Sequence, residues 1–546
     1  MVLLLFLIGI HNFLETENSP ICYGKESLDE RTTKLIRTSC EATDGEQPDM
    51  IFDPTVEFSL TEQPGFSSES SWYPEEVTQW ATSPYFSDSF PDLDASEQPG
   101  FSSESSWHPE EVTQWATSPY FSDSFLDRDV SGQDAVQYLY VFTFIDVLCL
   151  NTDVRQIAIE TTSKTGSSGR IFFPSQNASD MYFVLGPEEG RFFQLPASYQ
   201  RPHTDDSGLL LNSTVVVTAN DSVVVYAYQG CASGIGRQAS AFRVLERQRL
   251  GTDYWVLIHS RNKNAHLGIV AVEDNTAVVI SFNHTNGNVE MREQDIMLDK
   301  YVTFYLVLPF DATGTHITSN KKISVIVGVK SIILPPGSSN SEPFCESLEP
   351  VSTWGRAFSV AHFLGPEERN DYIVKFMSAV NDNNVNWKQG PYENETTLHQ
   401  GQSKELVVTA NMTDVLEINS SKDIVVAQFA TKGKPAFTNP AMTFIPPHKD
   451  GIGDEIFFPI FDLSYKGNVS NYLSVWVPLI EQQSHLVSLD GICTDWQILG
   501  GHVSGWKIFK TSLKAGFHVL RIKKGFKVRA MVFSAAKLRS FAHPVA

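Results

Sequence analysis

The sequence has few cysteines, and none of them form the closely spaced pairs that bind metals or exchange thiols. Six cysteines are spread over 546 residues, and no C-x-x-C pair occurs. This spacing argues against a zinc knuckle and against a thioredoxin-like motif. In a secreted chain, an even number of cysteines predicts disulfides that strengthen a core already formed. The candidate disulfide cysteines, whose pairing the sequence leaves open, are Cys22, Cys40, Cys149, Cys231, Cys345 and Cys493.

Short catalytic and cofactor-binding motifs are also missing. The sequence contains no G-x-S-x-G nucleophile turn, no H-E-x-x-H and no phosphate-binding G-x-x-x-x-G-K-[ST] loop. Its 14 histidines never fall within four residues of one another, which argues against a local zinc site. Residues 127–138 begin like a calcium-binding loop, but Tyr138 stands where a bidentate glutamate is required. We therefore predict no catalytic residue, no metal site and no cofactor.

Long apolar runs and basic faces are absent as well. No stretch approaches the about 18 apolar residues of a membrane-spanning helix, so we expect no transmembrane anchor. Residues 2–10 are apolar and suit the core of a signal peptide within residues 1–20, which predicts secretion. No basic face is present to make nucleic acid a partner.

The net charge of −23 comes almost entirely from one segment. Residues 41–134 contain 21 acidic residues and one basic residue, Arg128. Within this segment, residues 61–95 and 96–130 form a tandem repeat rich in Ser, Pro and Glu, with aromatic residues in each copy. This composition predicts that residues 21–134 are a disordered, acidic region. The region is either a duplicated spacer or a segment that adheres to a basic or carbohydrate partner.

Eight N-x-[S/T] acceptor sequences occur, all after residue 150. This is more than we expect by chance, and it supports an extracellular glycoprotein. The predicted glycosylation sites are Asn177, Asn212, Asn220, Asn283, Asn394, Asn411, Asn419 and Asn468.

From residue 135 onward, short β-branched and aromatic runs alternate with Gly, Asn, Asp and Pro turns, which predicts an all-β fold. The runs at 221–230, 321–330, 421–430 and 525–534 recur about every 100 residues, each after a polar turn. We therefore expect four related units, near residues 137–245, 246–349, 350–450 and 451–546. The second unit has six or seven candidate strands, enough for a small two-layer sandwich, and a propeller is the alternative.

The acidic pair Glu273 and Asp274 lies between two apolar runs, in "LGIVAVEDNTAVVISF". Asp and Asn favour tight turns, so we predict a hairpin whose strands flank residues 273–276. Adjacent carboxylates on a strand point to opposite faces. The two carboxylates of a glycosidase must instead converge across the scissile bond. We therefore interpret this pair as a turn and not as a reactive site.

Several segments resemble, in the same order, the IgGFc-binding protein N-terminal domain family. They are "VEDNTAVVISF" (272–282), "ASAFRVLERQRLGTDYWV" (239–256), "HITSNKKISVIVG" (316–328), "CESLEPVSTWGRAFSV" (345–360) and "NPAMTFIPP" (439–447). This resemblance covers the chain from about residue 210 to its end, with weaker support from 137. It implies secretion, adhesion and association with mucus or matrix, and it supplies no binding residues.

The chain departs from the family pattern at several positions. Ser331 stands where the family usually has a cysteine, so Cys345 lacks its usual partner and Cys231 is a substitute. Glu349 replaces the first proline of a P-P pair, and the segment around "NDNN" (381–384) is a degraded copy of the 273–276 turn. Trp354, in "STWG", is expected to be buried and not a binding aromatic.

The leading hypothesis is an adhesion or recognition protein, without catalysis, that binds extracellular proteins or glycans through exposed loops of rigid β units. A structural matrix or mucus component without a specific ligand is the alternative, and its acidic repeat would hydrate the gel. A glycan-active hydrolase is the remote alternative, and it would need carboxylates that converge only in the folded protein.

Overall fold

The computed structural model describes residues 138–545 except for short gaps, and these residues belong to one compact unit. Several sequence predictions lie outside the described residues: the predicted signal peptide (1–20), the acidic region (21–134), the predicted glycosylation sites Asn283, Asn411 and Asn468, and Cys22, Cys40, Cys149 and Cys493. The gaps are residues 148–152, 175, 200–206, 232–237, 262, 283–292, 339–340, 364–369, 410–414, 433–438, 452, 464–468, 480–485, 492–495, 504 and 537–538.

The described residues form strands, turns and three-residue 3-10 helices, so the prediction of an all-β fold is confirmed. The first strands build two sheets that form a two-layer arrangement. One sheet has the order β4 (Met181–Leu185), β3 (Ser167–Phe172), β7 (Thr214–Ala219), β1 (Tyr138–Thr143). The other has the order β5 (Gly190–Gln194), β2 (Asp153–Thr161), β8 (Val223–Cys231), β9 (Ala239–Arg243).

The next strands repeat this order around one long strand, β15 (His316–Ile332). The first half of β15 pairs with β10 and β12, and its second half pairs with β11 and β16. β15 therefore passes from one layer into the other. The remaining strands are β6 (Leu209–Leu211), β10 (Gly251–Trp255), β11 (Ala265–Ala271), β12 (Thr276–Ser281), β13 (Glu293–Leu298), β14 (Thr303–Leu308) and β16 (Glu342–Ser347).

A third group has the same arrangement around β22 (Leu416–Ala430). The first half of β22 pairs with β17 and β19, and its second half pairs with β18 and β23. The strands that surround β22 are β17 (Gly355–Val360), β18 (Tyr372–Ser378), β19 (Asn383–Gln389), β20 (Tyr392–Leu398), β21 (Ser403–Val408) and β23 (Ala441–Phe444).

The last strands again form two sheets, in the orders β24-β29-β26 and β27-β28-β25-β30-β31. Because the long strand is divided into β29 and β30, this group resembles the first one, where β7 and β8 are separate. The bounds are β24 (Glu455–Ile460), β25 (Val469–Pro478), β26 (Val487–Leu489), β27 (Gln497–Val503), β28 (Trp506–Leu513), β29 (Gly516–Ile522), β30 (Arg529–Ala536) and β31 (Arg539–Pro544). The boundaries of the four units given above stay a prediction.

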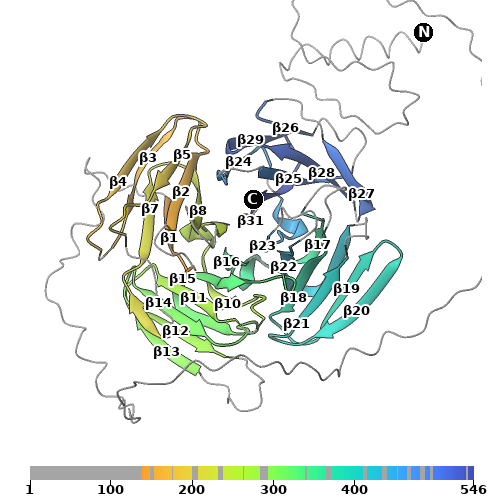
Figure 1. The fold of residues 1–546 in the computed structure, drawn as a ribbon, viewed down its shortest axis with the longest axis horizontal. Helices are drawn as coiled ribbons and strands as arrows, with labels where there is room; N and C mark the ends of the chain where they lie inside the picture. The colour runs from red at the N-terminus through yellow and green to blue at the C-terminus, as the bar shows by residue number, and fades with distance from the viewer. Residues whose placement is uncertain are drawn as a thin grey trace, which may run out of the picture. The chain divides into compact units, whose positions relative to one another are not determined.

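The last strand of each group meets the last strands of its neighbours in a closed cycle. β9 contacts β16, β16 contacts β23, β23 contacts β31, and β31 contacts β9. Figure 1 shows β16, β23 and β31 gathered at the centre, together with the C-terminus. We call β9, β16, β23 and β31 the ring strands, because they close the four groups of strands into a ring.

The two layers differ in how their sequences alternate. β12 has buried and partly exposed residues in strict alternation, as expected for a sheet with one face toward solvent. β11, β14 and β18 are buried at every position, because both faces of their layer are covered. This burial explains why runs such as 265–271 are continuously apolar, whereas 276–281 alternates.

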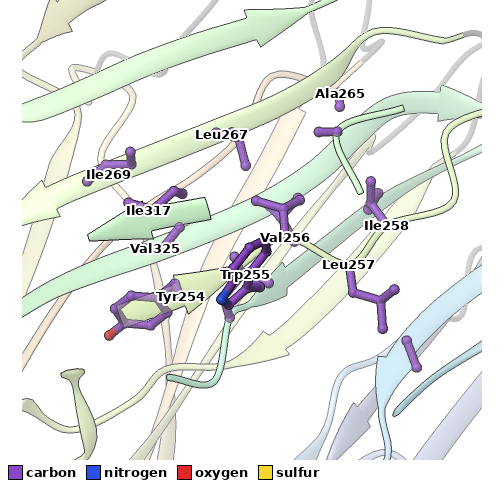
Figure 2. Close-up of a cluster of buried hydrophobic side chains, with 14 of the residues drawn as sticks. Tyr254, Trp255, Val256, Leu257, Ile258, Ala265, Leu267, Ile269, Ile317 and Val325 are labelled. Atoms are coloured by element: carbon purple, nitrogen blue, oxygen red, sulfur yellow. The ribbon is translucent and has the colours of Figure 1, made fainter. Parts of the chain in front are cut away.

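A core cluster connects the layers of the second group. Figure 2 shows Tyr254 and Trp255 of β10 among Leu267 and Ile269 of β11 and Val325 of β15. The same cluster continues into β22 and β23, so the second and third groups share a core. Truncating a buried leucine in such a cluster costs about 2–5 kcal/mol.

The predicted hairpin at residues 273–276 is wrong, although the turn itself is present. β15 lies between β11 and β12 in the sheet, so these two strands do not pair with each other. Residues 272–275 instead carry the chain over β15 from one layer to the other. The sequence does not reveal this because β15 begins some 40 residues later, at His316.

The suggested pairing of Cys231 with Cys345 is also wrong. Cys345 is a free, buried thiol in the core of the first group, although it belongs to β16. Cys231 forms a disulfide, packs against Val147, and has its partner outside the described residues.

Candidate functional site

The acidic pair that stands out in the sequence is tied into the turn it forms. The Asp274 carboxylate accepts a hydrogen bond from the Lys300 backbone N–H at 2.9 Å. The Glu273 carboxylate pairs with Arg247 at 3.0 Å, and Asn275 adopts a left-handed conformation with φ 53°. These contacts assign the pair to the turn between the layers, as interpreted from the sequence.

The segment around "NDNN" makes the same turn in the third group. Asp382 has φ 54°, like Asn275, and the side chain of Asn381 accepts a hydrogen bond from the Gln400 N–H at 3.1 Å. Asn383 is fully buried and donates to the Ser378 hydroxyl at 3.0 Å and to the Lys422 carbonyl at 3.1 Å. The turn therefore keeps its geometry although its sequence differs.

A cavity of about 350 Å³ opens at the end of the ring where the ring strands finish. Arg243 and Phe444, the last residues of β9 and β23, and Pro544, the last residue of β31, line it. Each ring strand is followed by a residue that makes the same backbone hydrogen bond. This residue donates its N–H to a carbonyl at the equivalent place on the strand that precedes the ring strand in the chain; the four donors are Val244, Leu348, Ile445 and Val545. The other lining residues are Arg249, Glu349, Ser352, Thr353, Trp354, Phe358, Ile424, Val425, Ile445, Pro446, Pro447 and Lys449.

The cavity is built by the connections between successive groups of strands. Each connection contains a short 3-10 helix: η1 (Arg247–Arg249), η2 (Val351–Thr353) and η4 (His448–Asp450). Pro350 and Pro447 are the N-cap residues of η2 and η4. Their φ angles of −65° and −68° are the ones that the proline ring fixes. A Cβ on Gly251 would lie 2.5 Å from Pro350, and one on Gly355 would lie 2.3 Å from Pro447. These close approaches require glycine and hold each connection against the next.

The one carboxylate among the described lining residues is already engaged. Glu349 pairs with Arg249 at 3.2 Å and accepts a hydrogen bond from the Thr353 hydroxyl at 3.2 Å. Its backbone carbonyl accepts the indole N–H of Trp354 at 3.1 Å. This carboxylate therefore neutralises Arg249 and connects two segments of the cavity wall.

Arg243 has no such partner. Within the part of the chain that the structure describes, its guanidinium makes no hydrogen bond and no ion pair. The side chain is half-buried and lines the cavity. Burial lowers the pKa of Arg243 from its ordinary value, and the neighbouring Arg249 lowers it further. The cavity thus presents a half-buried cation that makes no hydrogen bond and no ion pair with the described residues.

Beside the cavity, the ring itself is packed with polar side chains. Gln238, Glu342, Asn439 and Arg539 occupy equivalent places at the beginnings of the ring strands and are all buried. Glu342 accepts a hydrogen bond from Asn439 at 2.9 Å and another from the Ala239 N–H at 2.8 Å. Burial raises the pKa of Glu342 well above its ordinary value. Hydrogen bonds between different groups of strands therefore help to close the ring.

The sequence drew attention to some of the residues that line this cavity but assigned none of them a binding role. Glu349, Trp354 and Pro446–Pro447 lie in the segments that carried the family resemblance, and Trp354 is 2% exposed, as expected. Arg243 and Arg249 were missed because nothing local distinguishes them in "AFRVLERQRLGT". The described glycosylation sites Asn177, Asn212, Asn220 and Asn394 are exposed, whereas Asn419 is half-buried in β22.

Two further features are absent from the described residues. They contain no helix with the length and apolar character needed to cross a bilayer. They also contain no group of three or more His, Cys, Asp or Glu side chains placed to hold a metal ion.

These features define a class of protein, in which two-layer β units close into a ring with a charged cavity at one end. The model of the family described as IgGFc binding protein matches residues 240–531, from β9 into β30. Because this match covers more than half of the chain, the chain belongs to the IgGFc-binding protein family. The resemblance stated from the sequence is confirmed.

No curated protein matches the chain. Among solved structures, the chain is similar to a Ca²⁺-stabilized adhesin that helps an Antarctic bacterium reach out and bind ice, at 10% sequence identity. That similarity covers 75% of this chain and 98% of the adhesin chain, and its TM-score is 0.10. A score this low carries no argument about fold or function.

Proposed function

We propose that this chain is a secreted glycoprotein that recognises an extracellular protein or glycan, in mucus or matrix, without catalysing a reaction. The observation that carries the proposal is the cavity at the end of the ring, with its unpaired Arg243. Enclosed cavities with a few placed polar groups are typical of binding sites. Membership of a family named for binding supports the same function.

Sequence features support the extracellular setting of this function. Residues 2–10 suit a signal peptide, and eight acceptor sequences for N-linked glycans follow residue 150. The disulfide of Cys231 agrees with an oxidising environment. Each of these points toward secretion.

The cavity suits binding better than glycoside hydrolysis. A glycosidase uses two carboxyl groups that flank the scissile bond. Among the described lining residues, Glu349 is the one carboxylate, and Arg249 and Thr353 already occupy it. A structural role without a ligand is the second candidate, and the acidic repeat favours it because its charge would hydrate a gel.

The test is saturable binding by the full-length chain made in secretory cells and immobilised. Mucus and matrix extracts would be passed over it, with purified IgG Fc as a separate sample because of the family's name. Selective, saturable capture that is lost when the chain is reduced and unfolded is the expected result. Capture no greater than that of an unrelated glycoprotein would reject recognition and leave the structural role.

A further inference from the structure

We propose that the end cavity is a carboxylate-binding site whose ligand is an acidic peptide segment of the extracellular partner, bound by Arg243. This inference rests on the proposed function, since it names the chemistry that the recognised partner must present. It assigns the site to the end of the ring and not to exposed loops of single units.

The charges of the cavity require an anionic ligand. Three cationic side chains line it (Arg243, Arg249 and Lys449), and Glu349 is the one described carboxylate. Because Glu349 already pairs with Arg249, the remaining positive charge lies on the half-buried Arg243 and on the exposed Lys449. An incoming carboxylate would meet Lys449 first and Arg243 at the end of its path.

A half-buried guanidinium that lines a cavity and has no partner points to a ligand. Moving a charge out of water without pairing it destabilises a protein, so buried arginines normally have carboxylate partners. Arg243 has none among the described residues, although it occupies the end of a ring strand where an apolar residue, such as Phe444 or Pro544, stands in two other groups. The planar guanidinium of arginine matches a carboxylate with two parallel hydrogen bonds.

The walls of the cavity favour a peptide over an acidic sugar. Phe358, Phe444, Pro446, Pro447 and Pro544 supply apolar surface, and the Thr353 hydroxyl is already bound to Glu349 and to the Pro350 carbonyl. A sugar would bury hydroxyl groups against these walls without replacing their hydrogen bonds to water. A glutamate or aspartate beside an apolar residue would match both the walls and the charge.

The size of the cavity agrees with this ligand. Its volume of about 350 Å³ is at the lower end of the range for small-molecule sites, about 300–1,000 Å³. It therefore has room for one or two side chains of a peptide and not for a folded domain. The partner would insert an acidic segment and rest the remainder of its surface on the surrounding connections.

The experiment measures binding of short peptides to the full-length chain by calorimetry. The probe is an acetylated and amidated peptide containing Glu-Phe-Glu, and its counterpart containing Gln-Phe-Gln lacks the charge. Glucuronic acid and N-acetylneuraminic acid represent acidic sugars. We expect the acidic peptide to bind, the uncharged peptide to bind at least tenfold more weakly, and salt to weaken the acidic peptide.

Two variants and one control locate the binding. Arg243→Met should weaken the acidic peptide about ten- to a hundredfold, since a hydrogen-bonded ion pair is lost. The exposed Lys449→Ala should weaken it a few-fold without risk to the core. Arg191→Met, which removes an exposed arginine paired with Glu189, should change nothing.

Stability provides a readout that a structural role of Arg243 would not reproduce. We expect Arg243→Met to unfold at the same urea concentration as the wild type or at a higher one, because it removes a half-buried charge that has no partner. The proposal would be overturned if Arg243→Met clearly destabilised the protein and Lys449→Ala left the affinity for the acidic peptide unchanged.

The remaining outcomes separate this inference from the proposed function. If an extracellular partner is captured equally by the wild type and by Arg243→Met, recognition stands and the cavity site is overturned. If an acidic sugar binds and the acidic peptide does not, the peptide assignment is overturned. If neither partner nor peptide binds, both proposals fail.

Discussion

Glu160 offers a sharp test of the electrostatics of this fold. It lies on β2, where it pairs with Gly190 of β5 and Val224 of β8, and it is 1% exposed. Neither carboxyl oxygen has a hydrogen-bond partner among the described residues. The pKa of Glu160 is raised from 4.5 to about 9, mainly by burial and also by the nearby carboxylates of Asp490 and Glu188. Glu160 is therefore protonated in the folded protein at neutral pH.

The sign of the pH dependence follows from this pKa. Because the folded state binds the proton more tightly than the unfolded state, the stabilisation is complete below pH 4.5 and is lost as the pH rises toward 9. The loss is at most about 1.4 kcal/mol per pH unit. Between pH 5 and pH 8 this amounts to a ceiling of about 4 kcal/mol, and we expect about 2–4 kcal/mol because local relaxation reduces it.

The assay compares urea unfolding of the wild type and Glu160→Gln at pH 5, 6, 7 and 8, followed by tryptophan fluorescence. Glutamine keeps the shape but has no titrating proton, so the difference in unfolding free energy isolates Glu160 from other titrating groups. We expect this difference to shift by about 2–4 kcal/mol in favour of the variant as the pH rises. Glu393→Gln, at an exposed position on β20, is the matched control. A difference that stays constant from pH 5 to pH 8 would refute the reasoning.

Two substitutions and one glycan measurement test other parts of the structure. Asn383→Ala should lower the free energy of unfolding by about 1–3 kcal/mol in urea, because the Lys422 backbone N–H (2.9 Å) and carbonyl lose their partner; no loss would contradict the buried network. Gly355→Ala should cost about 1–3 kcal/mol in the same assay, since its Cβ would lie 2.3 Å from Pro447. Mass spectrometry after enzymatic deglycosylation should find glycans on the exposed acceptors and none on half-buried Asn419. Full occupancy of Asn419 would contradict its placement in β22. The exposed acceptors are Asn177, Asn212, Asn220 and Asn394.

The sequence predicts local features of this fold well. The alternation in residues 276–281 and the apolar run in residues 265–271 report how many faces of each strand are covered. Asn275 and Asp382 mark turns, because Asn and Asp tolerate the left-handed conformation that both adopt. These are short-range relations, and a single sequence contains them in full.

The pairing of distant strands was not predictable in the same way. β15 separates β11 from β12, and no local pattern in residues 265–281 indicates that a strand beginning at His316 lies between them. The environments of Glu160 and Arg243 were missed for a related reason. Each lies in a run whose local pattern would suit an exposed polar residue, but Glu160 is buried and Arg243 is half-buried in the folded protein.

The site exists because the four groups share a backbone plan and differ in side chains. The ring strands end in the same backbone hydrogen bond, from Val244, Leu348, Ile445 and Val545. The residue before each of these is Arg243, Ser347, Phe444 and Pro544 in turn. Four identical arginines there would repel one another, and four phenylalanines would fill the space. One arginine among smaller or apolar neighbours places a single charge at the ends of the ring strands. At the proposed site, this divergence among the repeats is what would let a ring of similar units select a ligand.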